Sequence, residues 1–275
     1  MEKLILKTLK LVTPIIWNGK NGGKLVVLIY HRVLKNQDFL MQGDVDCETF
    51  DWQKNLISKY CQPLSLGDAV EGLKNNTLPS GAICVTFDDG YRDNYTNALP
   101  ILKKYNVPAT VFVATSFLDG GCMWNDLVIE AVRAGVEKTK EYKTFNLIAD
   151  PNMVGFSKHK FLNNILHELK YKPHEERQLI SEDLLKIVNI KFPDLMMSST
   201  QVLNMHNAGI DIGAHTTTHP ILKMVSLKKA PVVDENLPII KSLLFVSIVP
   251  LAACELTRMP SIYIKCPEPL YTPTT

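Results

Sequence analysis

The sequence predicts an α/β domain built on a parallel sheet. Three short apolar runs, at 25–30 (LVVLIY), 82–87 (AICVTF) and 109–114 (ATVFVA), are rich in strand-forming residues and almost uninterrupted. Such runs are typical of strands buried on both faces. Segments with helical periodicity lie between them. This alternation indicates either an open doubly wound sheet or a barrel.

Composition narrows the class of protein. The chain has 275 residues, 46% of them hydrophobic, which is enough for one large core, and we expect a single domain over 1–275. A net charge of +2 argues against disorder and against a nucleic-acid partner. The six cysteines form no CxxC pair, so we expect reduced thiols and neither a zinc ribbon nor a thioredoxin-type motif.

The N-terminal segment, 1–23, predicts an amphipathic helix. Lys7 and Lys10 interrupt its apolar runs and no small-residue cleavage site follows, which is unlike a signal peptide. The helix could contact a membrane surface, although packing on the domain itself is the commoner outcome. The apolar run 243–254 is too short to span a bilayer. We therefore expect a cytoplasmic protein, or one peripheral on the inner membrane.

Helical patterns follow the first two strands. The first covers 50–60, and the second covers 97–105, where Pro100 is tolerated in a first turn. The segment 130–197 is rich in Lys, Glu and His with helical periodicity and has no clear buried strand. It predicts a helical insertion that either borders a site or is a plain surface elaboration.

One more helix and strand complete the predicted pattern. Ser198 and Gln201 have the spacing of a capping box, and Gly209 stands where the helix should end. The strand 210–214 (IDIGA) follows at once.

Two carboxylates, Asp88 and Asp89, directly follow the predicted strand 82–87. The carboxyl ends of strands are where α/β folds place their sites. Adjacent carboxylates repel each other and are costly to desolvate unless a cation or hydrogen-bond donors compensate. The pattern therefore indicates a metal site, or alternatively a solvated Asp-Asp-Gly turn.

Two histidines, His215 and His219, follow the strand 210–214 in the segment HTTTHP. Imidazoles four residues apart can face one way on a turn and bind one ion. The alternative is a pair of histidines with structural roles only. Together with a carboxylate they would leave positions open on Zn or another divalent ion for water and substrate.

Weaker candidates lie close to these motifs. His31 ends the first predicted strand and either enters the site or supports it from outside. Trp124 and Asp126 could line a sugar groove, or could simply begin a helix with a buried Trp. Tyr91 follows the paired carboxylates and is a candidate for shaping their loop or contacting substrate.

The sequence resembles the polysaccharide deacetylase family, also called the NodB-homology or carbohydrate esterase 4 group. The resemblance covers about 25–222 and includes LIYHRV, VTFDDGYRDNYTNALPILKKYNVPATVFVATSFL, the MWND segment and GIDIGAHTTTHPIL. Within the family it is most similar to bacterial deacetylases of exopolysaccharide or lipopolysaccharide synthesis.

The resemblance implies a distorted (β/α)7 barrel and a hydrolase that removes N-acetyl groups from amino sugars of a bacterial polysaccharide. It implies Asp88 as catalytic base and Asp89, His215 and His219 as ligands of one divalent ion, Zn or alternatively Co or Ni. Such an ion would activate water for attack on the acetamide carbonyl and stabilise the resulting oxyanion.

The resemblance ends at about Lys229. No histidine follows His219, and Arg258 gives only a faint match to the family's RxP segment, so no family-type general acid comes from the tail, 230–275. This tail also lacks the amphipathic helix and buried strand needed to close a barrel. Genuine divergence would explain it, and so would a frameshifted or internally deleted gene.

Three alternatives to a polysaccharide deacetylase follow. The same ion could serve hydrolysis of another amide, for instance on a small molecule or a lipid-linked sugar. The domain could be a catalytically silent barrel that binds carbohydrate. It could also be a truncated product that folds poorly.

Overall fold

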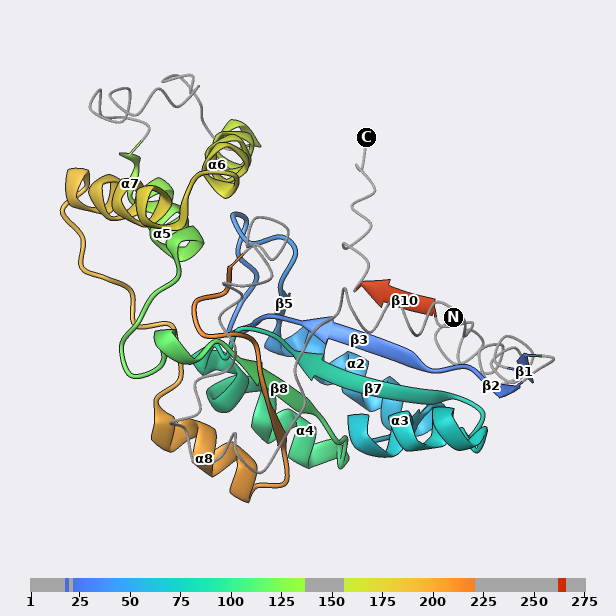
Figure 1. The fold of residues 1–275 in the computed structure, drawn as a ribbon. Helices are drawn as coiled ribbons and strands as arrows, with labels where there is room; N and C mark the ends of the chain where they lie inside the picture. Colours follow the sequence, from blue (N-terminus) through green and yellow to red (C-terminus); the bar gives the residue numbers. More distant parts are fainter. Residues whose placement is uncertain (1–17, 20–21, 137–155, 221–261, 266–275) are drawn as a thin grey trace, which may run out of the picture.

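The fold is an α/β domain with a parallel sheet, as the sequence predicts (Figure 1). The computed structural model describes residues 18–19, 22–136, 156–220 and 262–265. Within them the main sheet has six strands in the order β10-β3-β7-β8-β9, with β6 also paired to β7, and every pairing is parallel. The carboxyl ends of its strands therefore meet at one edge.

The central strands match the apolar runs of the sequence. They are β3 (Val26–Tyr30), β7 (Ala82–Phe87), β8 (Thr110–Val113) and β9 (Asp211–Ala214), joined at the sheet margin by β6 (Gln62–Pro63) and β10 (Ile262–Lys265). Every residue of β7 and β8 is buried. Two small sheets stand apart: β1 (Asn18–Gly19) with β2 (Gly22–Gly23), and β4 (Val33–Leu34) with β5 (Val45–Asp46).

Helices occupy the connections between strands. They are α2 (Cys47–Tyr60), α3 (Leu66–Asn75), α4 (Leu99–Tyr105), α5 (Trp124–Ala134), α6 (Phe156–Lys170), α7 (His174–Ile187) and α8 (Ser199–Asn207), with single turns η1 (Asn94–Ala98) and η2 (Thr115–Phe117). Helix α2 begins before the predicted Phe50 because Asp46 caps it, accepting the N–H of Thr49. The predicted helix 97–105 is split, since η1 precedes α4.

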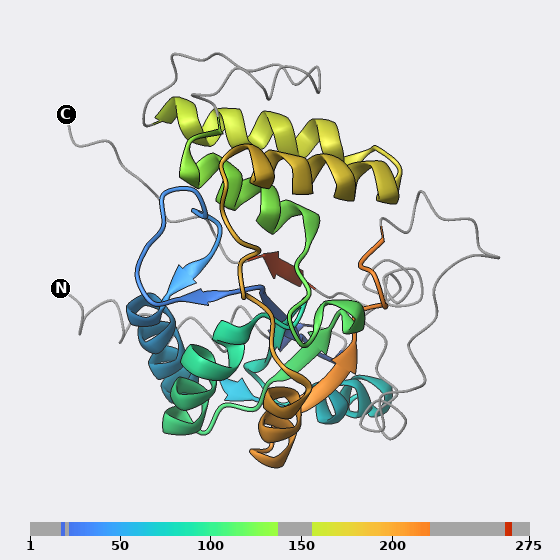
Figure 2. The ribbon, with the colours of Figure 1, turned by 90° about the vertical axis from the view of Figure 1, so that its left-hand side faces the viewer.

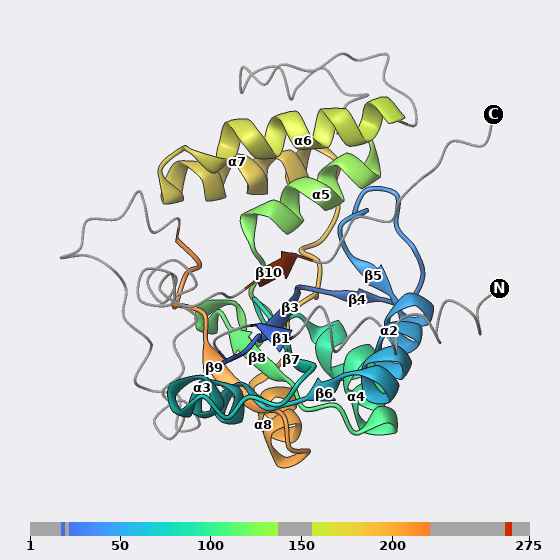
Figure 3. The ribbon, with the colours of Figure 1, turned by 90° about the vertical axis from the view of Figure 1, so that its right-hand side faces the viewer.

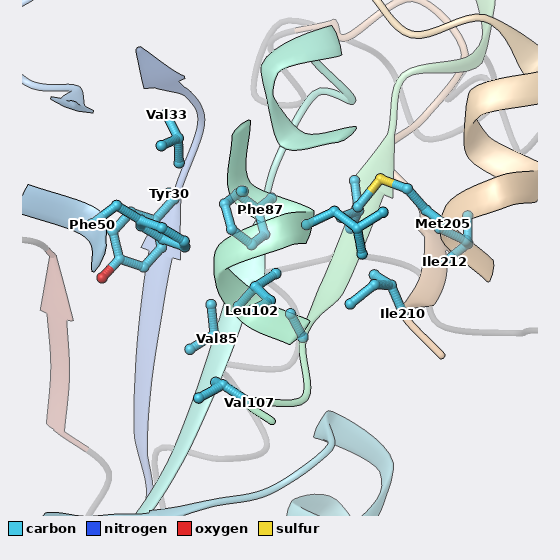
Figure 4. Packing of buried hydrophobic residues seen from close by; sticks show 14 of the residues in the cluster. Tyr30, Val33, Phe50, Val85, Phe87, Leu102, Val107, Met205, Ile210 and Ile212 are labelled. Atoms are coloured by element: carbon cyan, nitrogen blue, oxygen red, sulfur yellow. The ribbon is translucent and has the colours of Figure 1, made fainter. Parts of the chain in front are cut away.

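The main core lies between the sheet and the helices α2, α4 and α8. Figures 2 and 3 show these helices following one another around one side of the sheet. Tyr30, Phe50 and Phe87 form an aromatic group at its centre, with ring centroids 5.2–5.9 Å apart (Figure 4). Alternate residues of β3 and β7 point to the other face, where Cys84 packs in the cluster that includes Leu73 of α3. This alternation buries both faces of the central strands.

Helices α5, α6 and α7 form a second packed unit. They stand beside the carboxyl ends of β3, β7 and β8 (Figures 1 and 2). Their own core includes Leu127, Phe161, Ile165 and Leu184, all at most 1% exposed, and Leu40 of the β4–β5 loop joins it. The segment predicted as a helical insertion, 130–197, contains α6 and α7 in full.

The tail contributes strand β10 to the sheet, parallel to β3, with Ile262 opposite Val26. The sequence predicts no buried strand in the tail that would close a barrel, and β10 lies at the margin of the sheet, paired to β3. No pairing between β10 and β9 closes a barrel within the described strands. The remainder of 230–275 lies outside the described residues.

The N-terminal helix expected over 1–23 also lies outside them, apart from the residues of β1 and β2. Among the described helices, none has both the length and the apolar character that crossing a bilayer requires.

Helix α8 positions β9, and its start has the predicted capping box: Ser198 accepts the N–H of Gln201, while the Gln201 side chain accepts the N–H of Ser198. We expect Ser198→Ala to lower the free energy of unfolding by about 1 kcal/mol, because an N–H at the helix start loses its partner. Urea unfolding measures this. Exposed Thr200→Ala in the same helix is the control and should leave stability unchanged or slightly higher; equal losses in both variants would contradict the capping role.

Candidate metal centre

The paired carboxylates lie where β7 ends. The Asp88 N–H donates to the carbonyl of Tyr30 at 2.9 Å, and the Asp89 carbonyl accepts the Ala114 N–H at 3.1 Å. The loop is thus bonded to the ends of both neighbouring strands. Asp88 is 9% exposed and Asp89 4% exposed, which is deeper than a solvated turn would lie.

The backbone of this loop is left-handed at two consecutive residues, with φ +76° at Asp89 and +88° at Gly90. A Cβ at Gly90 would lie 3.0 Å from Val113 Cγ1, so the position needs glycine both for its φ and for the close approach of β8. Asp89, an ordinary residue with positive φ, is held in a conformation of the kind that clusters at functional sites.

The histidines follow β9 on a loop bonded to the end of β8. The His215 N–H donates to the Val113 carbonyl at 2.9 Å, and the Ser116 N–H donates to the Thr217 carbonyl at 3.0 Å. The His219 N–H donates to Thr216 Oγ1 at 3.1 Å, closing a turn in which His219 has φ +46°. These hydrogen bonds hold both imidazoles at the edge of the sheet where Asp89 lies.

Three ligand atoms converge there. Asp89 Oδ1 lies 3.3 Å from His215 Nε2 and 3.4 Å from His219 Nε2, and the two imidazole centroids are 4.8 Å apart. Four ligands placed about 2.0–2.1 Å from a zinc ion in a tetrahedron lie about 3.3–3.4 Å from one another. Asp89, His215 and His219 could therefore hold a metal ion.

Electrostatics support a cation at this place. Asp89 Oδ1 is buried without a hydrogen-bond partner among the described residues. Burial raises the pKa of Asp89 to about 7, helped by the charge of Asp44. Burial also lowers the pKa of His215 to about 3 and lowers that of His219. Neutral imidazoles facing an uncompensated carboxylate form a donor set that suits Zn²⁺. His215 Nδ1 has no partner within the described part of the chain, so nothing there fixes its tautomer.

Asp88 stands beside this donor set with a strongly perturbed acidity. Burial, together with the charge of Asp89, raises the pKa of Asp88 to about 7. A carboxyl group with a pKa near neutrality can both accept and release a proton at physiological pH.

The remaining sequence candidates lie around the centre. His31 is exposed at the end of β3, and its charge is one cause of the lowered pKa of His215. Tyr91 and Asp126 are buried, and the Tyr91 hydroxyl lies 3.2 Å from both carboxyl oxygens of Asp126. Trp124 is half-buried at the start of α5. Contact of any of them with substrate stays a prediction.

Sequence analysis missed the buried ion pair that joins the β3 and β7 loops. Arg32 Nε donates to Asp93 Oδ2 at 2.8 Å, and Asp93 Oδ1 accepts the Val33 N–H at 3.0 Å. The Arg32 guanidinium also stacks 4.8 Å from the Tyr91 ring. Arg32 lies in the motif IYHRV next to His31, and Asp93 lies in GYRDN shortly after Asp88. This closeness in sequence to candidate site residues was the signal that could have identified the pair. Asp44, whose pKa burial raises to about 6, had no such signal.

Comparison with known proteins confirms the resemblance to polysaccharide deacetylases. Residues 75–154 match the family model described as polysaccharide deacetylase. This range includes Asp88 and Asp89, whereas His215 and His219 lie beyond it.

Two curated relatives match over about 90 to 110 residues. The putative polysaccharide deacetylase YxkH of Bacillus subtilis is 34% identical over 91 residues, covering 33% of this chain and 32% of that protein. Poly-beta-1,6-N-acetyl-D-glucosamine N-deacetylase of Staphylococcus epidermidis is 29% identical over 109 residues, covering 34% and 37%. The chain thus spans about a third of the length of these relatives.

A solved structure, Streptococcus pyogenes deacetylase PplD in complex with acetate, superimposes with a TM-score of 0.42 at 20% identity, covering 74% of this chain and 62% of that one.

We expect the protein to bind one Zn²⁺ or Co²⁺ and Asp89→Ala to weaken this binding by about two orders of magnitude or more, because one of three ligands is lost. Calorimetric titration of the metal-free protein measures the affinity, and the visible spectrum of the Co²⁺ form reports the ligand set. Asp183→Asn, which changes a half-exposed carboxylate on α7, is the matched control. Unchanged affinity in Asp89→Ala would contradict the ligand assignment.

A second prediction concerns stability and pH. Burial raises the pKa of Asp126 to about 7, so the folded state holds this proton where the unfolded state has released it. The stability this group contributes is present at low pH and lost as pH rises through about 7. Asp126→Asn, which cannot titrate, should therefore gain stability relative to the wild type as pH rises from about 4 to about 7, by a few kcal/mol at about 1.4 kcal/mol per pKa unit.

Denaturant unfolding across this pH range checks it, with exposed Glu168→Gln as control. A difference between wild type and Asp126→Asn that stays constant with pH would contradict the assignment.

Proposed function

We propose, from the relationship of this chain to polysaccharide deacetylases, that it is a metal-dependent hydrolase that removes N-acetyl groups from amino sugars of a bacterial polysaccharide. The observation that carries the proposal is the convergence of Asp89, His215 and His219 beside Asp88 at the carboxyl edge of the sheet. We further propose that the sheet is part of a NodB-type distorted (β/α)7 barrel, for which the parallel order of β3, β7, β8 and β9 is the support.

Asp89, His215 and His219 would hold the ion, with Zn as the first candidate and Co or Ni as alternatives. A divalent ion at this place supplies a Lewis acid, which polarises the amide carbonyl and raises the acidity of water. The donor set of two imidazoles and one carboxylate leaves room on such an ion for water and substrate.

Asp88 is the residue to which we assign proton transfer. Its carboxylate takes a proton from the water that attacks the acetamide carbonyl. Because its pKa lies at about 7, the protonated form can return this proton to the leaving amine when the carbon–nitrogen bond breaks. Acetate and a free amino sugar are the products. This assignment needs no histidine after His219, which the sequence does not contain.

The Arg32–Asp93 pair and the Tyr91–Asp126 contact support this arrangement from below the loop. Each joins the segment after β7 to a neighbouring element, β3 or α5. We assign them the positioning of Asp88 and Asp89, because buried side chains with satisfied partners lock a site in place.

The proposal predicts acetate release from an N-acetylglucosamine oligomer by the zinc-loaded protein. Asp88→Asn should lower kcat by about 10²- to 10⁴-fold with little effect on zinc affinity, because the general base is lost and the ligands remain. Enzymatic acetate detection and calorimetry measure the two quantities, with Asp183→Asn as the matched control.

Two results would contradict it. Equal release by wild type and Asp88→Asn would show that this carboxylate is not the base. Tight glycan binding by a folded, zinc-loaded protein without any acetate release would favour a carbohydrate-binding role instead.

A further inference from the structure

Arg177 of α7 is a buried cation with an unusual set of contacts. Its residue is 3% exposed. The guanidinium stacks 4.8 Å from the centre of the Trp124 ring, and Nη1 donates to the Lys170 carbonyl at 3.1 Å. Nε is buried and has no hydrogen-bond partner among the described residues. The edge formed by Nε and Nη2 is therefore unused by the described protein.

No carboxylate of the described residues forms an ion pair with Arg177. The other described arginines, Arg32, Arg92 and Arg133, each pair with an aspartate. Burial is the cause of the lowered pKa of Arg177, with no neighbouring acid opposing it. A buried arginine stays charged, and an uncompensated buried charge is costly. An anionic ligand would remove this cost.

The position of Arg177 connects it to the metal centre. Trp124, on which it stacks, begins α5 directly after Met123, which packs with Tyr91 beneath the metal loop. The unit of α5, α6 and α7 stands beside the carboxyl ends of the strands (Figure 2). Arg177 is thus linked through Trp124 and Met123 to Tyr91, which follows the paired carboxylates.

We propose that Arg177 binds a carboxylate of the substrate, so that the preferred polysaccharide carries acidic sugars next to the N-acetylated one. This inference rests on the proposed deacetylase function. The free Nε–Nη2 edge offers two parallel N–H donors, which match the two oxygens of a carboxylate. The ring of Trp124 holds the guanidinium plane in place and reduces the entropy lost on binding.

The alternative is a structural role, in which Arg177 only joins the α6–α7 turn to the start of α5 through Lys170 and Trp124. Substitution of Arg177 would then reduce the stability of the fold and would weaken the binding of acidic and neutral ligands equally. The two roles are separated by comparing ligands that differ only in charge.

The test measures binding by the full chain loaded with zinc and carrying Asp88→Asn, so that substrate is not consumed. The probes are a hyaluronan tetrasaccharide, which alternates glucuronate with N-acetylglucosamine, and the neutral N-acetylglucosamine tetramer. We expect the acidic probe to bind at least about tenfold more tightly at low salt, with this preference reduced at high salt.

Arg177→Met keeps an apolar stem over Trp124 and removes the charge. This substitution should weaken binding of the acidic probe by about 10- to 100-fold and change the Kd of the neutral probe by less than about twofold. Arg177→Lys keeps the charge without the paired donors and should fall between wild type and Arg177→Met. Lys186→Gln, an exposed charge removed from the same helix, is the matched control and should leave both affinities unchanged.

Equal affinity of the two probes, absence of binding by the acidic probe, or an equal loss of both in Arg177→Met would overturn the assignment. Acetate release by the protein with native Asp88 is measured on both probes in parallel. A preserved charge preference without acetate release from either would refute the deacetylase proposal and leave the carboxylate site standing. Release from both at equal efficiency, with equal affinities, would refute the carboxylate site alone.

Discussion

Desolvation of two adjacent carboxylates at the end of β7 is the constraint on which the rest of this structure depends. Asp88 and Asp89 are both nearly buried, and burial raises the pKa of each to about 7. Two like charges in such a place destabilise the fold unless something compensates them. The imidazoles of His215 and His219 follow β9 and lie at the same edge of the sheet. Burial lowers the pKa of both histidines and so disfavours their charged forms. We propose that a bound cation supplies this compensation.

The surrounding structure holds these groups in place. Left-handed backbone at Asp89 and Gly90 turns the loop sharply after the strand, and only glycine fits against Val113. Arg32 is the central cation of this support, because it bonds Asp93 and stacks on Tyr91. The helices α5–α7 form a separate core that flanks the same edge. In the function we propose, the strands would carry the catalytic groups and the helical unit would flank the bound glycan.

Local sequence predicts the parts of this architecture that depend on local physics. Buried runs such as 82–87 favour central strands, and the Ser198–Gln201 spacing indicates a helix start. The motifs also indicate the metal centre, since Asp89 and the two histidines end strands that a parallel sheet brings together. The sequence does not reveal which side chains meet from distant segments. Arg177 is 88 residues from Asp89, within a segment whose pattern predicts a helical insertion that either borders a site or elaborates the surface, and its burial follows from the packing of α7 on α5. The sequence also does not predict the pairing of β10 with β3. A four-residue strand at a sheet margin pairs through backbone hydrogen bonds, which require no particular side-chain pattern.

The central claim, that a divalent ion is held by Asp89, His215 and His219, is tested most directly by crystals of the zinc-loaded protein measured on both sides of the zinc absorption edge. The account predicts one strong anomalous peak within bonding distance of Asp89 Oδ1, His215 Nε2 and His219 Nε2, with the Asp88 carboxylate beside it. A fully zinc-saturated protein whose anomalous peak lies elsewhere, or whose three side chains remain unliganded, would contradict it.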